Sequence, residues 1–192
     1  MLKGLYFWTL EKARHRHAAR WLAFLSFLES SVFPIPPDVM LVPMCLAARE
    51  KALRYGAICT VSSVLGAGFG YLIGALFWDA FGAPIIAFYG YEDAFAAFTA
   101  RFEDYGALAV FLFGLTVLPF KVITLASGVA GLDPLVFFLA AAAARAPRFF
   151  IEAALLWRYG APIAAFIERR LGILMSLFAI ALIGGFLTIR FL

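Results

Sequence analysis

The sequence contains few charged residues for its length, and this scarcity limits the classes of protein to which it can belong. Only 15% of its 192 residues are Asp, Glu, Lys or Arg, while 65% are hydrophobic. Soluble globular domains contain about 45–50% apolar residues. The composition therefore argues against a soluble globular domain and predicts an integral membrane protein with several hydrophobic helices.

Cysteine and histidine are also scarce. Cys45 and Cys59 lie in or beside apolar stretches, whereas His15 and His17 lie on a basic N-terminal arm. These four residues form neither a CxxC pair nor a metal-ligand pattern, so we expect no metal and no cofactor. The net charge of +4 fits loops that face anionic lipid headgroups, and we expect no nucleic-acid partner.

Three segments are predicted to cross the membrane as helices. A helix needs about 20 mostly apolar residues to cross a hydrocarbon core of about 30 Å. Segments 55–78 and 171–189 contain no charged residue, and segment 134–159 is apolar along most of its length. The sequence therefore predicts about three transmembrane helices, of which 171–189 is the last.

The first apolar segment, 21–48, is interrupted by a proline-rich turn. Pro34, Pro36 and Pro37 cannot continue a helix, because proline lacks an N–H group and its ring clashes with the preceding turn. Each half is too short to span, and both flanks are basic. We therefore predict a re-entrant hairpin over 21–48 after an interfacial amphipathic arm over 1–20. Its flanks and the N-terminus lie on the cytoplasmic side.

Segment 105–132 repeats this pattern, with an interruption at Pro119. An acidic, aromatic stretch over 79–104 precedes it and is expected to form an interfacial helix on the far side of the membrane. Because one crossing separates the two hairpins, they are predicted to be inverted relative to each other. Inverted repeats with broken helices are a transporter architecture. The predicted fold is an all-α integral membrane protein containing an inverted repeat of two re-entrant helical hairpins, about three transmembrane helices and interfacial amphipathic helices.

Six charged residues are predicted to lie at membrane depth. A charge at the bilayer centre costs about 2.5–3.5 kcal/mol on insertion scales, so these residues must pair or line a wet cavity. On a helix, Arg148 and Glu152 form a favourable i, i+4 pair. The candidate site residues are Glu29 and Asp38 at the first turn, Lys121 at the second, and Arg145, Arg148 and Glu152 on segment 134–159.

Structural roles for these residues are open alternatives. Asp38 could cap the helix that follows Pro37, and Glu29 could be a structural partner of an arginine. Arg145 and Arg148 could extend to the cytoplasmic interface.

Three sequence stretches resemble motifs of the DedA family and occur in the same order as in that family. The domain of this family is also called the VTT or SNARE-associated domain. The three stretches are FLESSVFPIPPDVML, LPFKVITLASGVAG and ARAPRFFIEAALLWRYG. The resemblance covers about 21–160 and is closest to the YqaA-like branch. It implies a bacterial inner-membrane protein with opposed re-entrant loops that moves lipids, with suggested proton coupling. Glu29 and Asp38 match the family's embedded acids, whereas Thr116 and Lys121 stand where the typical branch has two arginines.

The predicted function is a membrane lipid transporter or scramblase. Lys121, Arg145 and Arg148 would attract the phosphate of a phospholipid or of undecaprenyl phosphate. Glu29 and Asp38 would hold these cations or carry a proton.

Two other classes of function are alternatives to lipid transport. One is a proton- or cation-coupled transporter of small solutes, and the other is an intramembrane enzyme acting on lipid phosphates. We do not expect an enzyme, because no histidine lies in the core and Ser30, Ser31 and Ser127 have no evident base. GxxxG pairs in segment 55–78 permit a homo-oligomer.

Overall fold

The computed structural model describes residues 17–31, 36–90, 92–116, 119–160 and 162. Within these ranges every regular element is a helix, so the predicted all-α class is confirmed for them. The helices are α2 (Ala18–Ser31), α3 (Asp38–Ala47), α4 (Ala52–Phe77), α5 (Ala83–Tyr89), α6 (Glu92–Leu115), α7 (Phe120–Val129) and α8 (Pro134–Tyr159), with the short turns η1 (Arg49–Lys51) and η2 (Trp78–Gly82) at the two ends of α4.

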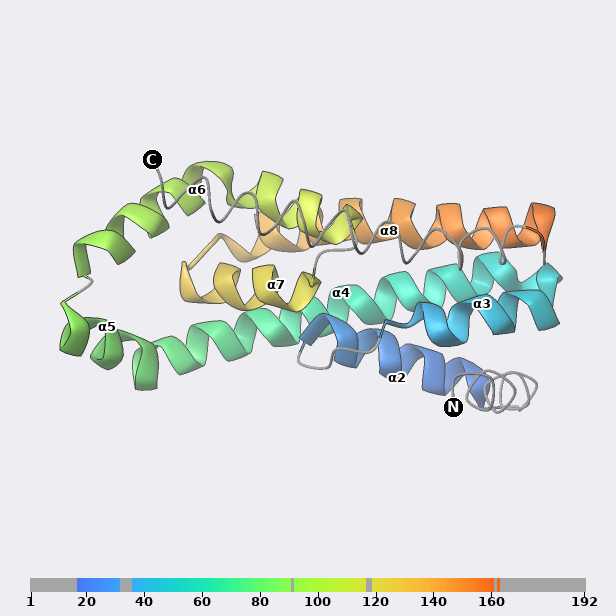
Figure 1. The fold of residues 1–192 in the computed structure, drawn as a ribbon, viewed down its shortest axis with the longest axis horizontal. Helices are drawn as coiled ribbons and strands as arrows, with labels where there is room; N and C mark the ends of the chain where they lie inside the picture. The colour runs from blue at the N-terminus through green and yellow to red at the C-terminus, as the bar shows by residue number, and fades with distance from the viewer. Residues whose placement is uncertain (1–16, 32–35, 91, 117–118, 161, 163–192) are drawn as a thin grey trace.

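Helices α4 and α8 form the long frame of the protein (Figure 1). Each has 26 residues, which at about 1.5 Å per residue exceeds a hydrocarbon core of about 30 Å. Both are long and apolar enough to cross a membrane. They correspond to the predicted spans 55–78 and 134–159, and the third predicted span, 171–189, lies outside the described residues.

Two helical hairpins enter this frame from opposite ends. In Figure 1, α2 runs from one end of the molecule towards its middle and α3 returns to the same end, while α6 and α7 do the same from the other end. Pro37 directly precedes α3 and Pro119 directly precedes α7. Pro34 lies outside the described residues. The placement of these hairpins in a membrane as re-entrant loops stays a prediction.

No helix ends at the predicted boundary between the interfacial stretch 79–104 and the second hairpin 105–132, and the placement of this boundary relative to the membrane stays a prediction. The chain forms η2 and α5, and then α6 runs without a break from Glu92 to Leu115. The composition changes after Asp104, but no proline accompanies the change. Gly106 alone costs about 1 kcal/mol in a helix interior, which does not end a helix of this length. At the N-terminal side, α2 begins at Ala18, before the expected start at 21.

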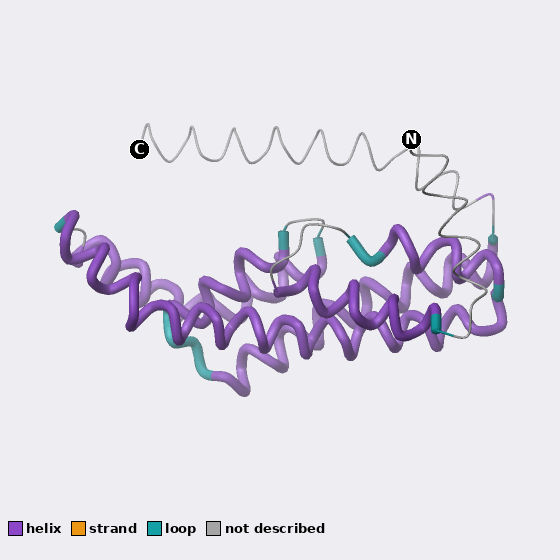
Figure 2. Tube along the Cα trace, turned by 90° about the horizontal axis from the view of Figure 1, so that it is seen from below, coloured by secondary structure: helices purple, strands orange, loops and turns teal. Residues whose placement is uncertain are grey.

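In the described part of the chain, the buried apolar residues form two clusters, one at each end of the helix bundle. The first joins α2, α3, the start of α4 and the end of α8. The second joins α6, α7, the later part of α4 and the start of α8. The views in Figures 1 and 2 show both ends of this elongated bundle of helices. A polar layer is left between the two clusters.

The glycines of α4 let the hairpins pack closely against this helix. A Cβ atom added to Gly66 would overlap the backbone carbonyl of Phe27 in α2, and one added to Gly74 would overlap that of Leu125 in α7. The glycines of the GxxxG pairs therefore serve contacts within the chain, and the possible homo-oligomer stays a prediction.

Overpacking at Gly66 should destabilise the fold. Gly66→Leu should lower the free energy of unfolding by at least about 1–3 kcal/mol, because a carbonyl group cannot move aside as a flexible side chain can. Thermal unfolding in detergent, followed by circular dichroism, measures the change. Val61→Leu is the control, since Val61 is 60% exposed on the same helix. Equal unfolding curves for the two variants would contradict the packing described.

Candidate functional site

The polar layer lies near the middle of both long helices. Along α4, Ser63 lies between Cys59 of the first apolar cluster and Ala67 of the second. Along α8, Arg145 lies between residues of the same two clusters. Helix α2 adds Glu29 and α3 adds Asp38, so four helices meet at this layer.

Arg145 is the centre of the layer, and its side chain is only 1% exposed. Its guanidinium group forms an ion pair with Glu29. It also donates hydrogen bonds to Ser30 Oγ at 3.0 Å and to Ser63 Oγ. The two serine hydroxyls are 2.6 Å apart. One arginine from α8 therefore ties together α2 and α4, and each of these polar groups has a partner.

Aromatic rings enclose the Arg145 guanidinium and extend its contacts to the second hairpin. Phe120 of α7 lies 4.6 Å from the guanidinium carbon and Phe149 of α8 lies 5.0 Å from it, both measured to the ring centroid. Near the same point, Thr124 of α7 donates to the backbone carbonyl of Ser30 at 3.2 Å. The inner ends of the two hairpins thus meet at Arg145.

A second ion pair lies one turn further along α8. Arg148 Nη2 donates to Asp38 Oδ2 at 2.9 Å, and the two side chains are 17% and 26% exposed. Asp38 is the first residue of α3, but no side-chain capping bond forms there. Its carboxylate is used for the arginine. Through this contact Arg148 faces α3 inside the helix bundle.

Glu152 completes the cluster, but not as predicted. Among the ion pairs of the described residues, Arg148 pairs with Asp38 and not with its i, i+4 neighbour Glu152. The carboxyl groups of Glu152 and Asp38 lie within hydrogen-bonding reach of each other. Three buried atoms of this group lack a partner: Asp38 Oδ1, Arg148 Nη1 and Glu152 Oε1.

Lys121 is the predicted charged site residue for which the structure shows no side-chain contact with this cluster. It lies in the first turn of α7, is partly buried, and forms no ion pair with any described residue. The structure therefore brings together Glu29, Asp38, Arg145, Arg148 and Glu152, while Lys121, at the second break, has no ion-pair partner among the described residues. The described residues contain no group of three or more His, Cys, Asp or Glu side chains that could hold a metal ion.

Sequence reasoning missed Ser63 and the aromatic enclosure of Arg145. Ser63 could have been found, because it lies on the same face of α4 as Cys59, Gly66 and Gly70, at spacings of three and four residues. A hydroxyl on the face of a helix that packs against others is a natural partner for a buried charge. Phe120 and Phe149 carry no comparable signal in a chain with 22 phenylalanines.

Comparison with known proteins identifies the family of this chain. The family model of the VTT domain matches residues 35–158. An uncharacterized protein of Haemophilus influenzae is 35% identical over 184 residues, which cover 95% of each chain. An uncharacterized protein of Histophilus somni is 33% identical over 147 residues, covering 77% of this chain and 76% of the relative. No solved structure matches the chain.

The matched residues 35–158 include Asp38, Lys121, Arg145, Arg148 and Glu152. VTT-domain proteins are membrane proteins of a transporter type, which agrees with the two long apolar helices. The resemblance found in the sequence is therefore confirmed, and the chain belongs to the VTT-domain family, also called the DedA family.

Proposed function

We propose that this protein moves a phosphate-bearing lipid between the two leaflets of the bacterial inner membrane. The observation that carries the proposal is the charged layer at the middle of two candidate spans, joined to both hairpins through Arg145. Charged groups at membrane depth are costly and mark substrate or ion pathways. The N-terminus would lie on the cytoplasmic side, as the basic arm over 1–20 predicts.

The three cations of the site have different accessibility, which suggests different roles. Arg145 is enclosed by its partners and positions the inner ends of the hairpins. Lys121 has no competing carboxylate among the described residues, so its ammonium group is the best placed to meet a lipid phosphate. It lies at the N-terminus of α7, where the backbone also favours an anion. Arg148 is partly exposed and could exchange Asp38 for a phosphate oxygen.

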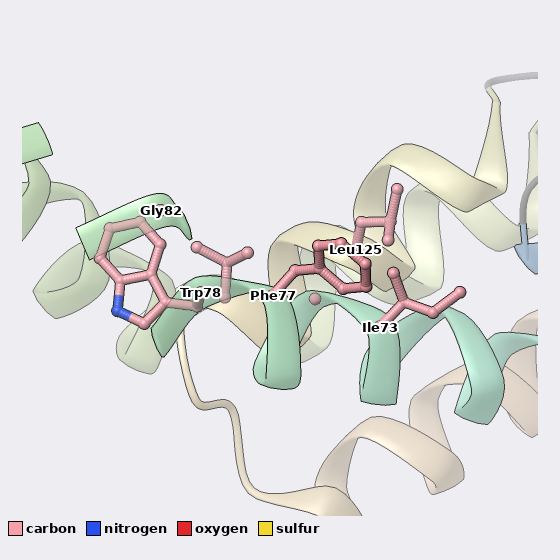
Figure 3. Close-up of a pocket in the computed structure, with 7 residues that line it drawn as sticks. Ile73, Phe77, Trp78, Gly82 and Leu125 are labelled. Carbon is pink, nitrogen blue, oxygen red and sulfur yellow. The ribbon is translucent and has the colours of Figure 1, made fainter. Parts of the chain in front are cut away.

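An apolar groove of about 410 Å³ lies between α4 and α7 (Figure 3). Ile73 and Phe77 line it from α4, and Leu125 and Val129 line it from α7. Lys121, Leu125 and Val129 are spaced by four residues, so they follow one face of α7. A lipid with its phosphate near Lys121 could place an acyl chain along this groove. An apolar groove on the same helix face as a lysine suits an amphipathic substrate better than a small polar solute.

The geometry offers little to an enzyme acting on lipid phosphates. Ser30 Oγ donates to Glu29 Oε2 at 3.1 Å, and no other described serine hydroxyl forms a hydrogen bond with a carboxylate. Glu29 is already paired with Arg145, which also donates to the Ser30 hydroxyl. A serine nucleophile needs a base that is free to accept its proton, and both the hydroxyl and the carboxylate are engaged by the same arginine here. Transport of unchanged lipid is therefore the favoured function.

Leaflet exchange of a fluorescent phospholipid in proteoliposomes tests the proposal. We expect vesicles with the wild-type protein to exchange the lipid faster than protein-free vesicles and to leave it chemically intact. A lipid phosphate converted to product would indicate an enzyme. Counterflow of a soluble ion without lipid movement would indicate a small-solute transporter, and either result would overturn the proposal.

A further inference from the structure

Three carboxylates and two guanidinium groups meet in the polar layer. The carboxylates belong to Glu29, Asp38 and Glu152, and the cations are Arg145 and Arg148. Two ion pairs account for four of these groups and leave Glu152 over. Lys121 does not compensate for it, because it forms no ion pair with a described residue. Fully ionised, the layer would carry one uncompensated negative charge, which is very costly in a medium of low polarity.

Two of the buried atoms without a hydrogen-bond partner belong to the same residues that would carry the excess negative charge. Asp38 Oδ1 and Glu152 Oε1 are buried acceptors without a donor, although the two carboxyl groups are within hydrogen-bonding reach. Two ionised carboxylates cannot bond to each other, since both only accept. Arg148 Nη1 is a buried donor of the same group, but it forms no hydrogen bond with either oxygen. A proton on one carboxyl group supplies a donor to the other and removes the excess charge. Two carboxyl groups at this separation cannot both stay ionised at low cost.

The surroundings contain no other described group that would neutralise Glu152. The groups that face it are Asp38 and Cys45 of α3, Cys59 of α4 and Arg148 of its own helix. The thiols carry no positive charge, and Arg148 is engaged with Asp38. We infer that Asp38 and Glu152 share one proton in the resting protein, and that Glu152 is the third acid of the site.

The shared proton itself does not depend on the proposed function, but its consequence for transport rests on it. With the shared proton in place the layer is electrically neutral, so an anionic headgroup that approaches Arg148 meets one negative charge fewer. Proton and phosphate should then favour each other's binding, and such coupling is reciprocal. Lipid exchange should accordingly become faster as the pH falls, and Glu152→Gln should weaken this dependence on pH.

Infrared spectroscopy of the purified full chain in lipid nanodiscs tests the shared proton without any substrate. At neutral pH the wild type should show the C=O stretching band of a protonated carboxyl group, shifted in D₂O. Glu152→Gln should lose this band. Asp38→Asn should lose it too, because Glu152 can then ionise beside Arg148. Glu103→Gln on the exposed acidic part of α6 is the control and should retain the band.

The infrared spectrum of the wild type tests the shared proton even if a variant does not fold. Labelling all glutamates with ¹³C at the carboxyl carbon should shift the band if Glu152 holds the proton for part of the time. A wild type without a protonated carboxyl band, or a band unchanged by Glu152→Gln, would overturn the inference. Lipid exchange with no such band would reject the shared proton and keep the proposed function. A protonated carboxyl band in a protein that does not exchange lipid would support the shared proton and reject the proposed function.

Discussion

Arg145→Met is expected to destabilise the protein by about 3–5 kcal/mol, the usual cost of breaking a buried ion pair from one side. The substitution leaves Glu29 without its cation and removes the donor to Ser30 and Ser63. Methionine is apolar and flexible, so it fills most of the space between Phe120 and Phe149. The loss therefore reports on charge and hydrogen bonding more than on packing. Urea unfolding in detergent micelles, followed by circular dichroism, measures it.

The double variant Glu29→Gln/Arg145→Met should recover much of this stability. It removes the buried charge that the single variant leaves unpaired, and replacing a whole buried ion pair is often neutral or stabilising. Arg54→Met is the matched control, because Arg54 is exposed at the start of α4. A single variant as stable as the wild type, or a double variant no more stable than the single one, would show that Arg145 does not hold the layer together.

Lys121→Ala is expected to slow lipid exchange about tenfold or more while leaving the stability of the fold nearly unchanged. Hydrogen bonds to a charged group contribute about 1.5–3 kcal/mol, and each 1.36 kcal/mol changes a rate about tenfold. The fold should tolerate the change because Lys121 forms no ion pair with a described residue. Exchange in proteoliposomes and unfolding in detergent are measured on the same preparation.

Two further variants show whether the loss belongs to Lys121. Lys121→Arg keeps the positive charge and should retain most of the exchange. Lys51→Ala removes an exposed lysine from η1 and should have no effect. Equal exchange rates for Lys121→Ala and the wild type would remove this residue from the transport path. A Lys121→Ala protein that unfolds more easily would give it a structural role instead.

Much of this architecture could be predicted from the sequence, because membranes impose simple rules on it. A run of apolar residues long enough to cross the bilayer predicts α4 and α8, and prolines predict the breaks before α3 and α7. The cost of charge at depth singled out the residues that meet in the polar layer. These signals are local or depend on composition, so a single sequence contains them.

The pairing of these charges could not be predicted in the same way. Glu29 and Arg145 are 116 positions apart, and Asp38 and Arg148 are 110 apart. Only the packing of α2, α3 and α8 brings them together. Local spacing favoured Arg148 with Glu152, but an arginine side chain is long enough to reach an acid on another helix. Helix α6 continues past Asp104, so the change in composition at that residue did not predict the end of a helix.

The most direct test of the central claim compares two lipids that differ in their phosphate. Vesicles containing the wild-type protein would receive either a fluorescent phospholipid or a fluorescent glycolipid that has the same acyl chains and no phosphate. If the charged site binds the phosphate, the protein should accelerate exchange of the phospholipid relative to protein-free vesicles. It should not accelerate exchange of the glycolipid. Equal acceleration of both lipids would contradict the central claim, because a general disturbance of the bilayer would then account for the movement.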